Sequence, residues 1–192
     1  MDLGGVPPAA QEWQQAWLSA FAQFAARRPD RAAEAAHFAD FVRRRPDAAQ
    51  RELAEGHLTG SAWLVSADGR RVLLTHHRKL GLWLQLGGHA DGDTDLARVA
   101  LREAEEESGL TDLSVEPEIF DLDCHAIPAR GSDAEHFHFD VRFVVRANGS
   151  EAFVVSEESH ALAWREIAEV AADAGMDASV RRMARAWLAR RP

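Results

Sequence analysis

Residues 87–110 read GGHADGDTDLARVALREAEEESGL and form the most informative segment of the chain. Apolar residues recur at helical spacing from Leu96, and Gly109 stands where a helix would end, so we predict a helix over 96–108. Glu103, Glu106 and Glu107 stand at i, i+3 and i+4 and therefore share one face of that helix. Carboxylates crowded in this way are good ligands for hard cations, which prefer oxygen donors.

An acidic helix face taken alone is usually only a solvated surface. Three neighbouring features favour a metal site instead. Arg102 can orient a carboxylate through a bidentate pair. Gly109 ends the helix directly after the acidic cluster. The pair Gly87-Gly88, upstream of the helix, offers bare backbone that can approach a metal or a phosphate.

These residues resemble the signature of the Nudix family, which is Gly, five residues, Glu, seven residues, then Arg-Glu-apolar-x-Glu-Glu-x-Gly-apolar. Gly88 matches its first position, and the positions from Arg102 to Leu110 match the rest at the correct spacing. One position departs, because Thr94 stands where the family usually has a glutamate that braces the arginine. Asp93 and Asp95 are candidate substitutes. The resemblance covers about residues 58–167, since the flanking predicted strands also fit.

The resemblance implies a Nudix-type α/β/α sandwich with a mixed β-sheet, in which one to three Mg²⁺ or Mn²⁺ ions assist the attack of water on a diphosphate linkage. It implies metal ligands at the Gly87 carbonyl, Glu103, Glu106 and Glu107, and catalytic roles for Arg102, Glu103 and Glu106. The family's general base varies in position. Among the later acidic residues we favour Glu158, although a solvated loop is an equal interpretation of that residue.

The substrate that this resemblance implies is a small nucleoside diphosphate linked to another moiety. ADP-ribose-like compounds, nucleotide sugars and nucleoside triphosphates all remain open. Two rival functions also remain, a non-catalytic nucleotide sensor and a diphosphate isomerase of the same architecture. The isomerases rely on a cysteine in a specific segment, and Cys124 has no convincing counterpart there.

A basic stretch and a nearby tryptophan are candidates for substrate binding. Arg78 or Lys79 can bind a phosphate, and Trp83 can stack on a base, although exposed basic loops and packed strand aromatics are common alternatives. We assign substrate contacts to Arg78, Lys79, Trp83 and His89.

Two alternating polar sets, Asp121/Asp123/His125 and His136/His138/Asp140, would each lie on one face of a strand. Histidine and carboxylate together can form a transition-metal site. No Cys-x-x-Cys or His-Glu-x-x-His accompanies them, so we interpret both sets as a polar wall of the substrate pocket. We expect Cys124, which lies among them, to be a packed strand residue rather than a nucleophile.

The chain divides at about Gly56 into an N-terminal helical extension, residues 1–56, and a Nudix domain, residues 57–192. We predict helices over 8–26 and around Phe38, a short third helix, and a final helix over 177–191. The motif Arg-Arg-Pro-Asp at 27–30 and again at 44–47 favours a stop followed by a new start, with Asp30 as a cap. The aromatic stripe of the first helix can pack on the sandwich, form a homodimer interface, or both.

The remaining segments favour strands. Apolar runs at 61–66 and 72–77 flank Asp68-Gly69 and predict a hairpin. Further strands are expected at 82–86, 113–123, 136–147 and 152–155.

Composition limits the classes of partner. The 192 residues carry a net charge of −9, which argues against binding a nucleic acid polymer. No run of 18 apolar residues predicts a membrane span. A single cysteine and the lack of a basic-then-apolar N-terminus predict a cytoplasmic protein.

Overall fold

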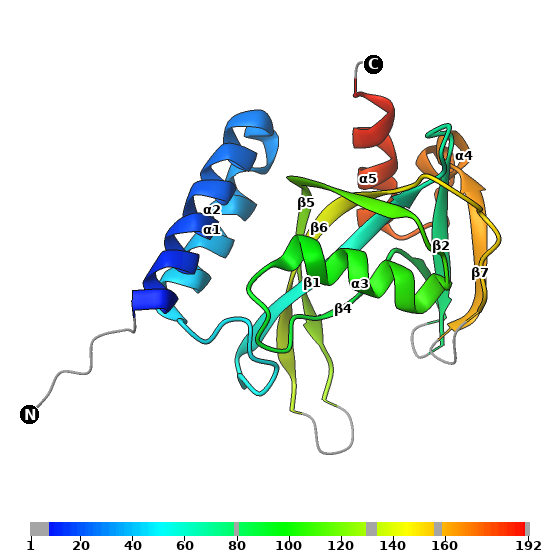
Figure 1. Cartoon of the computed structure of the whole chain (residues 1–192). Helices are drawn as coiled ribbons and strands as arrows, with labels where there is room; N and C mark the ends of the chain where they lie inside the picture. The colour runs from blue at the N-terminus through cyan, green and yellow to red at the C-terminus, as the bar shows by residue number, and fades with distance from the viewer. Residues whose placement is uncertain (1–7, 79–80, 130–133, 156–158, 191–192) are drawn as a thin grey trace, which may run out of the picture.

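A curled mixed β-sheet forms the centre of the molecule (Figure 1). The computed structural model describes residues 8–78, 81–129, 134–155 and 159–190. The described strands are β1 Gly56–Val65, β2 Arg71–His77, β3 Trp83–Leu84, β4 Leu86–His89, β5 Leu113–Ile127, β6 His136–Ala147 and β7 Ser159–Glu166. Their order is β3-β2-β1-β6-β5, with β4 beside β1 and β7 beside β2. The β1–β6 pair is parallel and the other pairs are antiparallel.

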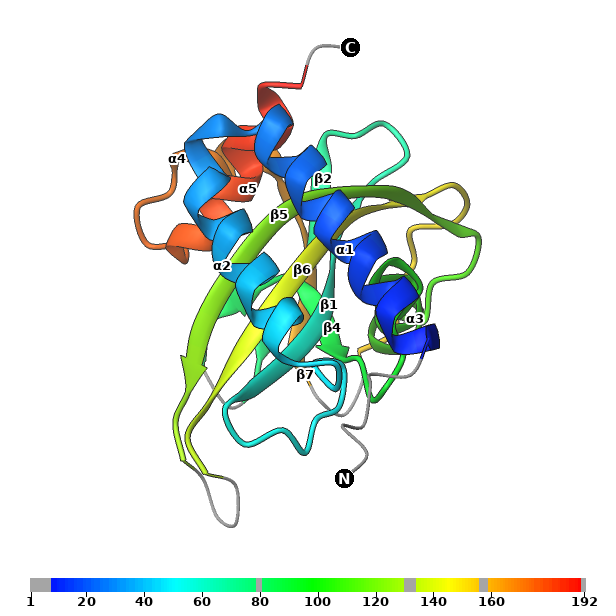
Figure 2. The same ribbon diagram turned by 90° about the vertical axis from the view of Figure 1, so that its left-hand side faces the viewer.

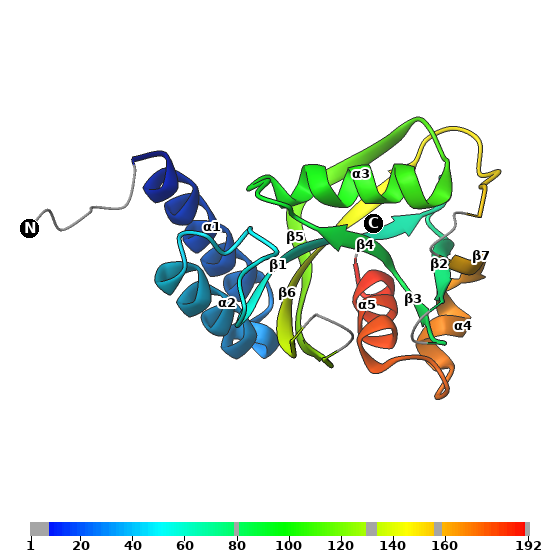
Figure 3. The ribbon, with the colours of Figure 1, turned by 90° about the horizontal axis from the view of Figure 1, so that it is seen from below.

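Helices cover both faces of this sheet. They are α1 Pro8–Arg27, α2 Ala32–Arg44, α3 Leu96–Ser108, α4 Ile167–Ala172 and α5 Ala178–Leu188. Side chains alternate along β1, so Leu64 packs into the core shared with α1, α2 and α3, whereas Trp63 packs against α4 and α5. Figure 3 shows α3 and α5 on opposite sides of the strands. The predicted α/β/α sandwich is confirmed.

The helices α1 and α2 form a hairpin that lies across β5 and β6 (Figure 2). The aromatic stripe of α1 faces inward, and Phe21 and Phe24 are fully buried in the core next to α3. The guanidinium groups of Arg27 and Arg31 donate to carbonyl oxygens of β5, at 3.3 and 2.6 Å. The extension is therefore packed on the sandwich.

The two Arg-Arg-Pro-Asp motifs end α1 and α2 as predicted, but their aspartates do not cap a following helix. Asp30 pairs with Arg28 instead, and α2 begins after Arg31 without a side-chain cap. Asp47 pairs with Arg45 in the same way. The short third helix is wrong, because residues 46–49 form only a turn.

Most of the predicted strands are present, with different limits. β1 begins five residues earlier than the predicted 61–66, and β4 extends through Gly87 and Gly88 to His89. The strand predicted at 152–155 is wrong, because this segment is irregular and Val154 N–H donates to the Ser108 carbonyl. The structure adds β7 and α4, which the sequence analysis missed. Ile167, Val170 and Ala171 of α4 are buried at helical spacing, a signal that was available.

Candidate metal and substrate site

Helix α3 has the predicted limits because both of its ends are fixed locally. The Asp95 carboxylate accepts a hydrogen bond from Arg98 N–H at 3.1 Å, which caps the first turn. Gly109 adopts the left-handed conformation with φ 66° and ends the last turn. The apolar face, which includes Val99 and Ala104, is buried against the sheet. Two glutamates of the predicted site, Glu103 and Glu107, lie along the side of the helix next to β4.

Strand β4 contacts two of these glutamates through its glycines. Glu107 is only 9% exposed, and its carboxylate accepts a hydrogen bond from Gly87 N–H at 2.8 Å. At Gly88, a Cβ atom would collide with the Glu103 carboxylate, so only a bare Cα leaves room for it. Glu106, in contrast, is exposed. The predicted proximity of the Gly-Gly pair to the acidic helix is therefore present, in a strand rather than a loop.

Arg102 holds this arrangement together. Its guanidinium donates to the Glu103 carboxylate at 2.9 Å and to the His89 carbonyl oxygen at 3.1 Å. The hydrogen bond to Glu103 raises the pKa of Arg102, so the guanidinium stays charged. One arginine thus ties α3 to the end of β4 and orients a carboxylate that the sequence assigns to metal binding.

Neither Asp93 nor Asp95 bonds to Arg102 in place of the glutamate that is missing at Thr94, and other contacts hold this loop. Asp93 pairs with Arg98, through contacts of 2.7 and 3.1 Å, and acts on Arg102 only through its charge. Asp95 is the helix cap. The Thr94 carbonyl oxygen accepts a hydrogen bond from the Trp17 indole at 2.9 Å. Helix α1 therefore supports this loop.

The donor set of α3 and β4 fits a hard divalent cation. It offers three carboxylates of α3, and two of them lie next to glycine backbone of β4 that a ligand can approach. The Glu103 carboxylate binds Arg102, and the Glu107 carboxylate accepts a hydrogen bond from Gly87 N–H. Each of these like charges therefore has its own partner.

Two of the predicted substrate contacts, Arg78 and Trp83, differ in how far they are exposed. Arg78 is exposed in the turn after β2, and Trp83 of β3 packs partly on the core beside His76, with ring centroids 5.2 Å apart. Lys79 and Glu158 lie outside the described residues.

His89 belongs to a cluster of imidazoles that the sequence analysis did not assemble. Its ring lies 5.1 Å from those of both His57 and His138, between centroids. His125 and His136 complete the cluster around His138. Burial, reinforced by neighbouring histidines, lowers the pKa of His57 to about 4 and that of His138 to about 2. These two rings are therefore neutral at pH 7.

His57 was missed because its partners are remote in sequence. The parallel β1–β6 register places His57 directly beside His138, and no local pattern reveals that pairing. The antiparallel β5–β6 register places His125 beside His138 and Asp123 beside Asp140, so the two polar sets lie on the same face of the sheet.

The carboxylates of those sets bind one buried and one partly buried arginine. Arg142 is 2% exposed and pairs with Asp140 at 2.7 Å and Asp121 at 3.3 Å. Arg182 of α5 pairs with Asp121 and Asp123, each at 2.7 Å. Burial alone would raise the pKa of Asp123, but its hydrogen bond with His125 and these arginine charges hold that pKa well below its usual value.

Cys124 is partly buried on β5. Burial, with smaller contributions from Glu34 and Asp123, raises the pKa of its thiol to about 11. A thiol of this kind is a poor nucleophile at neutral pH, as the sequence analysis expected.

A cavity of about 620 Å³ lies along α5, but its lining includes no residue of the acidic site. Several of its arginines already bind carboxylates. Arg28 pairs with Asp30, Arg182 with Asp121, and Arg190 with Glu116. This cavity is therefore distinct from the candidate site at α3 and β4.

Comparison with protein families identifies the class of protein. The model of the NUDIX domain matches residues 57–187, and the chain therefore belongs to the Nudix family. No curated protein matches. None of the helices in the described part of the chain has the length and hydropathy that a bilayer span requires.

Solved structures share the fold at low sequence identity. An Ap4A hydrolase binary complex from C. elegans is 19% identical with a TM-score of 0.54, over 69% of this chain and 95% of that one. The MutT protein from Methanosarcina mazei Go1 is 16% identical with a TM-score of 0.53, over 70% and 94%. The E. coli dihydroneopterin triphosphate pyrophosphohydrolase is 17% identical with a TM-score of 0.53, over 66% and 91%.

Proposed function

We propose that this Nudix protein hydrolyses a diphosphate linkage in a nucleoside diphosphate derivative, using water activated by Mg²⁺ or Mn²⁺. The observation that carries the proposal is the seating of α3 against β4. There, Gly88 leaves room for the Glu103 carboxylate, Arg102 orients it, and Gly87 N–H fixes Glu107. The family membership and the hydrolases among the similar folds support the same reaction class.

The proposed metal ligands are Glu103, Glu106, Glu107 and the Gly87 carbonyl. When bound, a divalent cation lowers the pKa of water and neutralises charge that develops on the phosphoryl oxygens. The chain's own contribution is to hold these oxygen donors in place. Arg102 fixes Glu103, and the buried Glu107 is held by β4. The exposed Glu106 is free of such packing, so it is best placed to change its contacts as ions and substrate bind.

The nucleotide would lie beside the end of β4. Arg78, Lys79 and Trp83 are the proposed substrate contacts, and Glu158 is the proposed base. His89 is not kept as a substrate contact, because strand alternation turns its side chain to the face of β4 opposite Glu103. ADP-ribose-like compounds, nucleotide sugars and nucleoside triphosphates are the substrate classes to test. A cytoplasmic location and a homodimer stay predictions from the sequence.

The experiment is phosphate release from a panel of these nucleotides, with Mg²⁺ or Mn²⁺ and after chelation. Glu106→Gln is expected to lower turnover by about 100-fold or more, because it removes a charged metal ligand without a packing change. Glu105→Gln is the matched control, since Glu105 is exposed on the same helix turn but lies outside the signature. Its turnover should equal that of the wild type.

Equal turnover in the wild type and in Glu106→Gln would exclude the proposed site. Tight nucleotide binding by the wild type without turnover on any substrate would instead identify a nucleotide sensor.

A further inference from the structure

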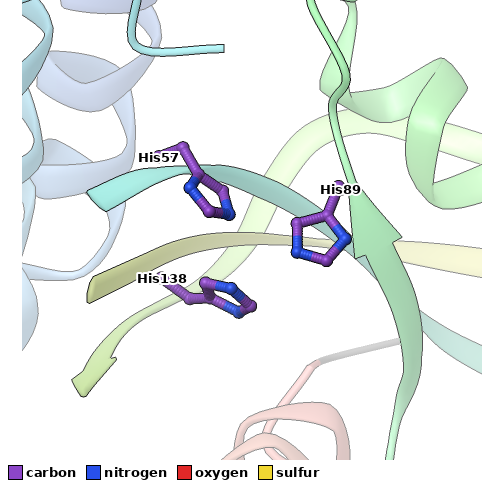
Figure 4. A group of neighbouring side chains, drawn as sticks. All are labelled: His57, His89 and His138. Atoms are coloured by element: carbon purple, nitrogen blue, oxygen red, sulfur yellow. The ribbon is translucent and has the colours of Figure 1, made fainter. Parts of the chain in front are cut away.

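The histidine cluster at the end of β1 and β4 lies apart from the carboxylates of α3. Figure 4 shows His57, His89 and His138 converging from three different strands. Their candidate ligand atoms all lie within 4.8 Å of one another. Gly88 faces Glu103 on the α3 side, and strand alternation directs the neighbouring His89 side chain to the opposite face of the sheet. The two sets of ligands are therefore separate.

His57 provides an independent indication that a ligand is bound there. Its side chain is only 2% exposed, yet neither ring nitrogen has a hydrogen-bond partner among the described residues. A buried polar group without a partner costs about 1–3 kcal/mol, and such groups in native proteins usually contact water or an ion. The centroid of its ring also lies 5.1 Å from that of His89 and 4.8 Å from that of His138.

We infer that His57, His89 and His138 form a binding site for a transition metal, of which Zn²⁺ is the best match. Neutral imidazole nitrogen is the donor that Zn²⁺ and its neighbours prefer, whereas Mg²⁺ prefers oxygen. In a tetrahedral site the ligand nitrogens stand about 3.4 Å apart, given Zn–N distances of about 2.0–2.1 Å. Ligand atoms that all lie within 4.8 Å of one another are close to this spacing. The partly exposed His136 lies beside these ligands, with its Nε2 atom 3.3 Å from Nε2 of His138.

Arg51 contacts one of the three proposed ligands, His89, and must move before that ligand binds the metal. Its guanidinium donates to Nδ1 of His89 at 2.9 Å, so the ring proton stays on Nε2. For Nε2 to bind the metal, that proton moves to Nδ1 and Arg51 withdraws. Asp91, which already pairs with Arg51 at 3.3 Å, can hold the withdrawn guanidinium.

The test is titration of the metal-free, full-length protein with Zn²⁺ by calorimetry, in excess Mg²⁺ to occupy the carboxylates of α3. Co²⁺ absorption spectra report the ligand geometry in parallel. We expect one Zn²⁺ per chain. Loss of an outer-sphere partner typically weakens a metal site 10–100-fold, so loss of a direct ligand in His89→Ala should weaken it by at least about 100-fold. His57→Leu should do the same while leaving the protein folded, because an apolar side chain suits the buried position.

Two controls separate this site from the proposed hydrolytic site. Zn²⁺ affinity should be unchanged in His37→Ala, an exposed histidine of α2, and in Glu106→Gln. It should increase in Arg51→Ala, which removes a competing cation. The inference is wrong if the wild type binds no Zn²⁺ or Co²⁺, or if His89→Ala and His57→Leu bind them as tightly as the wild type. Unchanged or weaker binding by Arg51→Ala would show that Arg51 does not compete with the metal for His89. None of these outcomes depends on nucleotide turnover.

Discussion

The indole N–H of Trp17 donates a 2.9 Å hydrogen bond to the carbonyl oxygen of Thr94. Thr94 occupies the one position that departs from the Nudix signature, and Asp95, the cap of α3, follows it directly. The N-terminal helix therefore fixes the loop that sets where the helix of the metal site begins. A residue outside the NUDIX match supports the segment in which the signature is incomplete.

Trp17→Phe keeps an aromatic ring against Phe21 and Phe143 but removes the indole N–H. We expect a loss of about 0.5–1.5 kcal/mol in the free energy of unfolding, the usual contribution of one hydrogen bond, and reduced turnover. Urea denaturation and nucleotide hydrolysis measure the two effects. Trp13→Phe, one turn earlier on α1, is the control. If both variants behave alike, the hydrogen bond to Thr94 does not support the loop.

The glycines of β4 should respond differently to an added methyl group. In Gly88→Ala the new Cβ meets only the flexible end of Glu103, so the carboxylate moves and turnover should fall at least tenfold with a small change in stability. In Gly87→Ala it meets the side chain of Ser61 and its Cα at 2.8 Å, so the fold should lose about 1–3 kcal/mol. Denaturation curves and the Mg²⁺ dependence of turnover distinguish these outcomes. The opposite order of effects would contradict the seating of Glu103 against Gly88.

Arg142 should be the most sensitive charged residue of the core. Arg142→Met leaves Asp140 buried without its cation and leaves Asp121 with Arg182 alone, and removing one partner of a buried ion pair costs about 3–5 kcal/mol. Arg182→Met should cost less, because Arg182 is 25% exposed, its partner Asp123 is 22% exposed, and its buried partner Asp121 keeps Arg142. Urea denaturation gives the free energies of unfolding. Equal losses in both variants would show that burial does not set the cost.

Cys124 should react slowly with iodoacetamide in the folded protein. Because its pKa is raised to about 11, the thiolate fraction is small at pH 8 and grows about tenfold with each pH unit up to that pKa. Mass spectrometry of the alkylated protein from pH 7 to 10 measures this slope, and the urea-unfolded chain provides the unperturbed rate. A rate that levels off near pH 8 or 9 would show that the burial of Cys124 does not raise its pKa.

Local signals predicted α3 and β6 to the residue, because the apolar spacing of α3, the glycine that follows it and the alternation at the start of β6 lie in or next to the segments themselves. Prediction failed where a neighbouring side chain binds a residue that was expected to have another role. Asp30 pairs with Arg28 instead of capping α2. It also failed at 152–155, where the backbone bonds to the end of α3 rather than to a strand.

The sequence by itself determined the family and the shared face of Glu103, Glu106 and Glu107, since both depend on spacing along one helix. Only the tertiary structure brought His57 to His138 and His89, because the registers of β1 with β6 and β4 join residues far apart in the chain. The same holds for Trp17 and Thr94. Contacts within a helix follow from its period, whereas contacts between strands and helices follow from how buried surfaces pack.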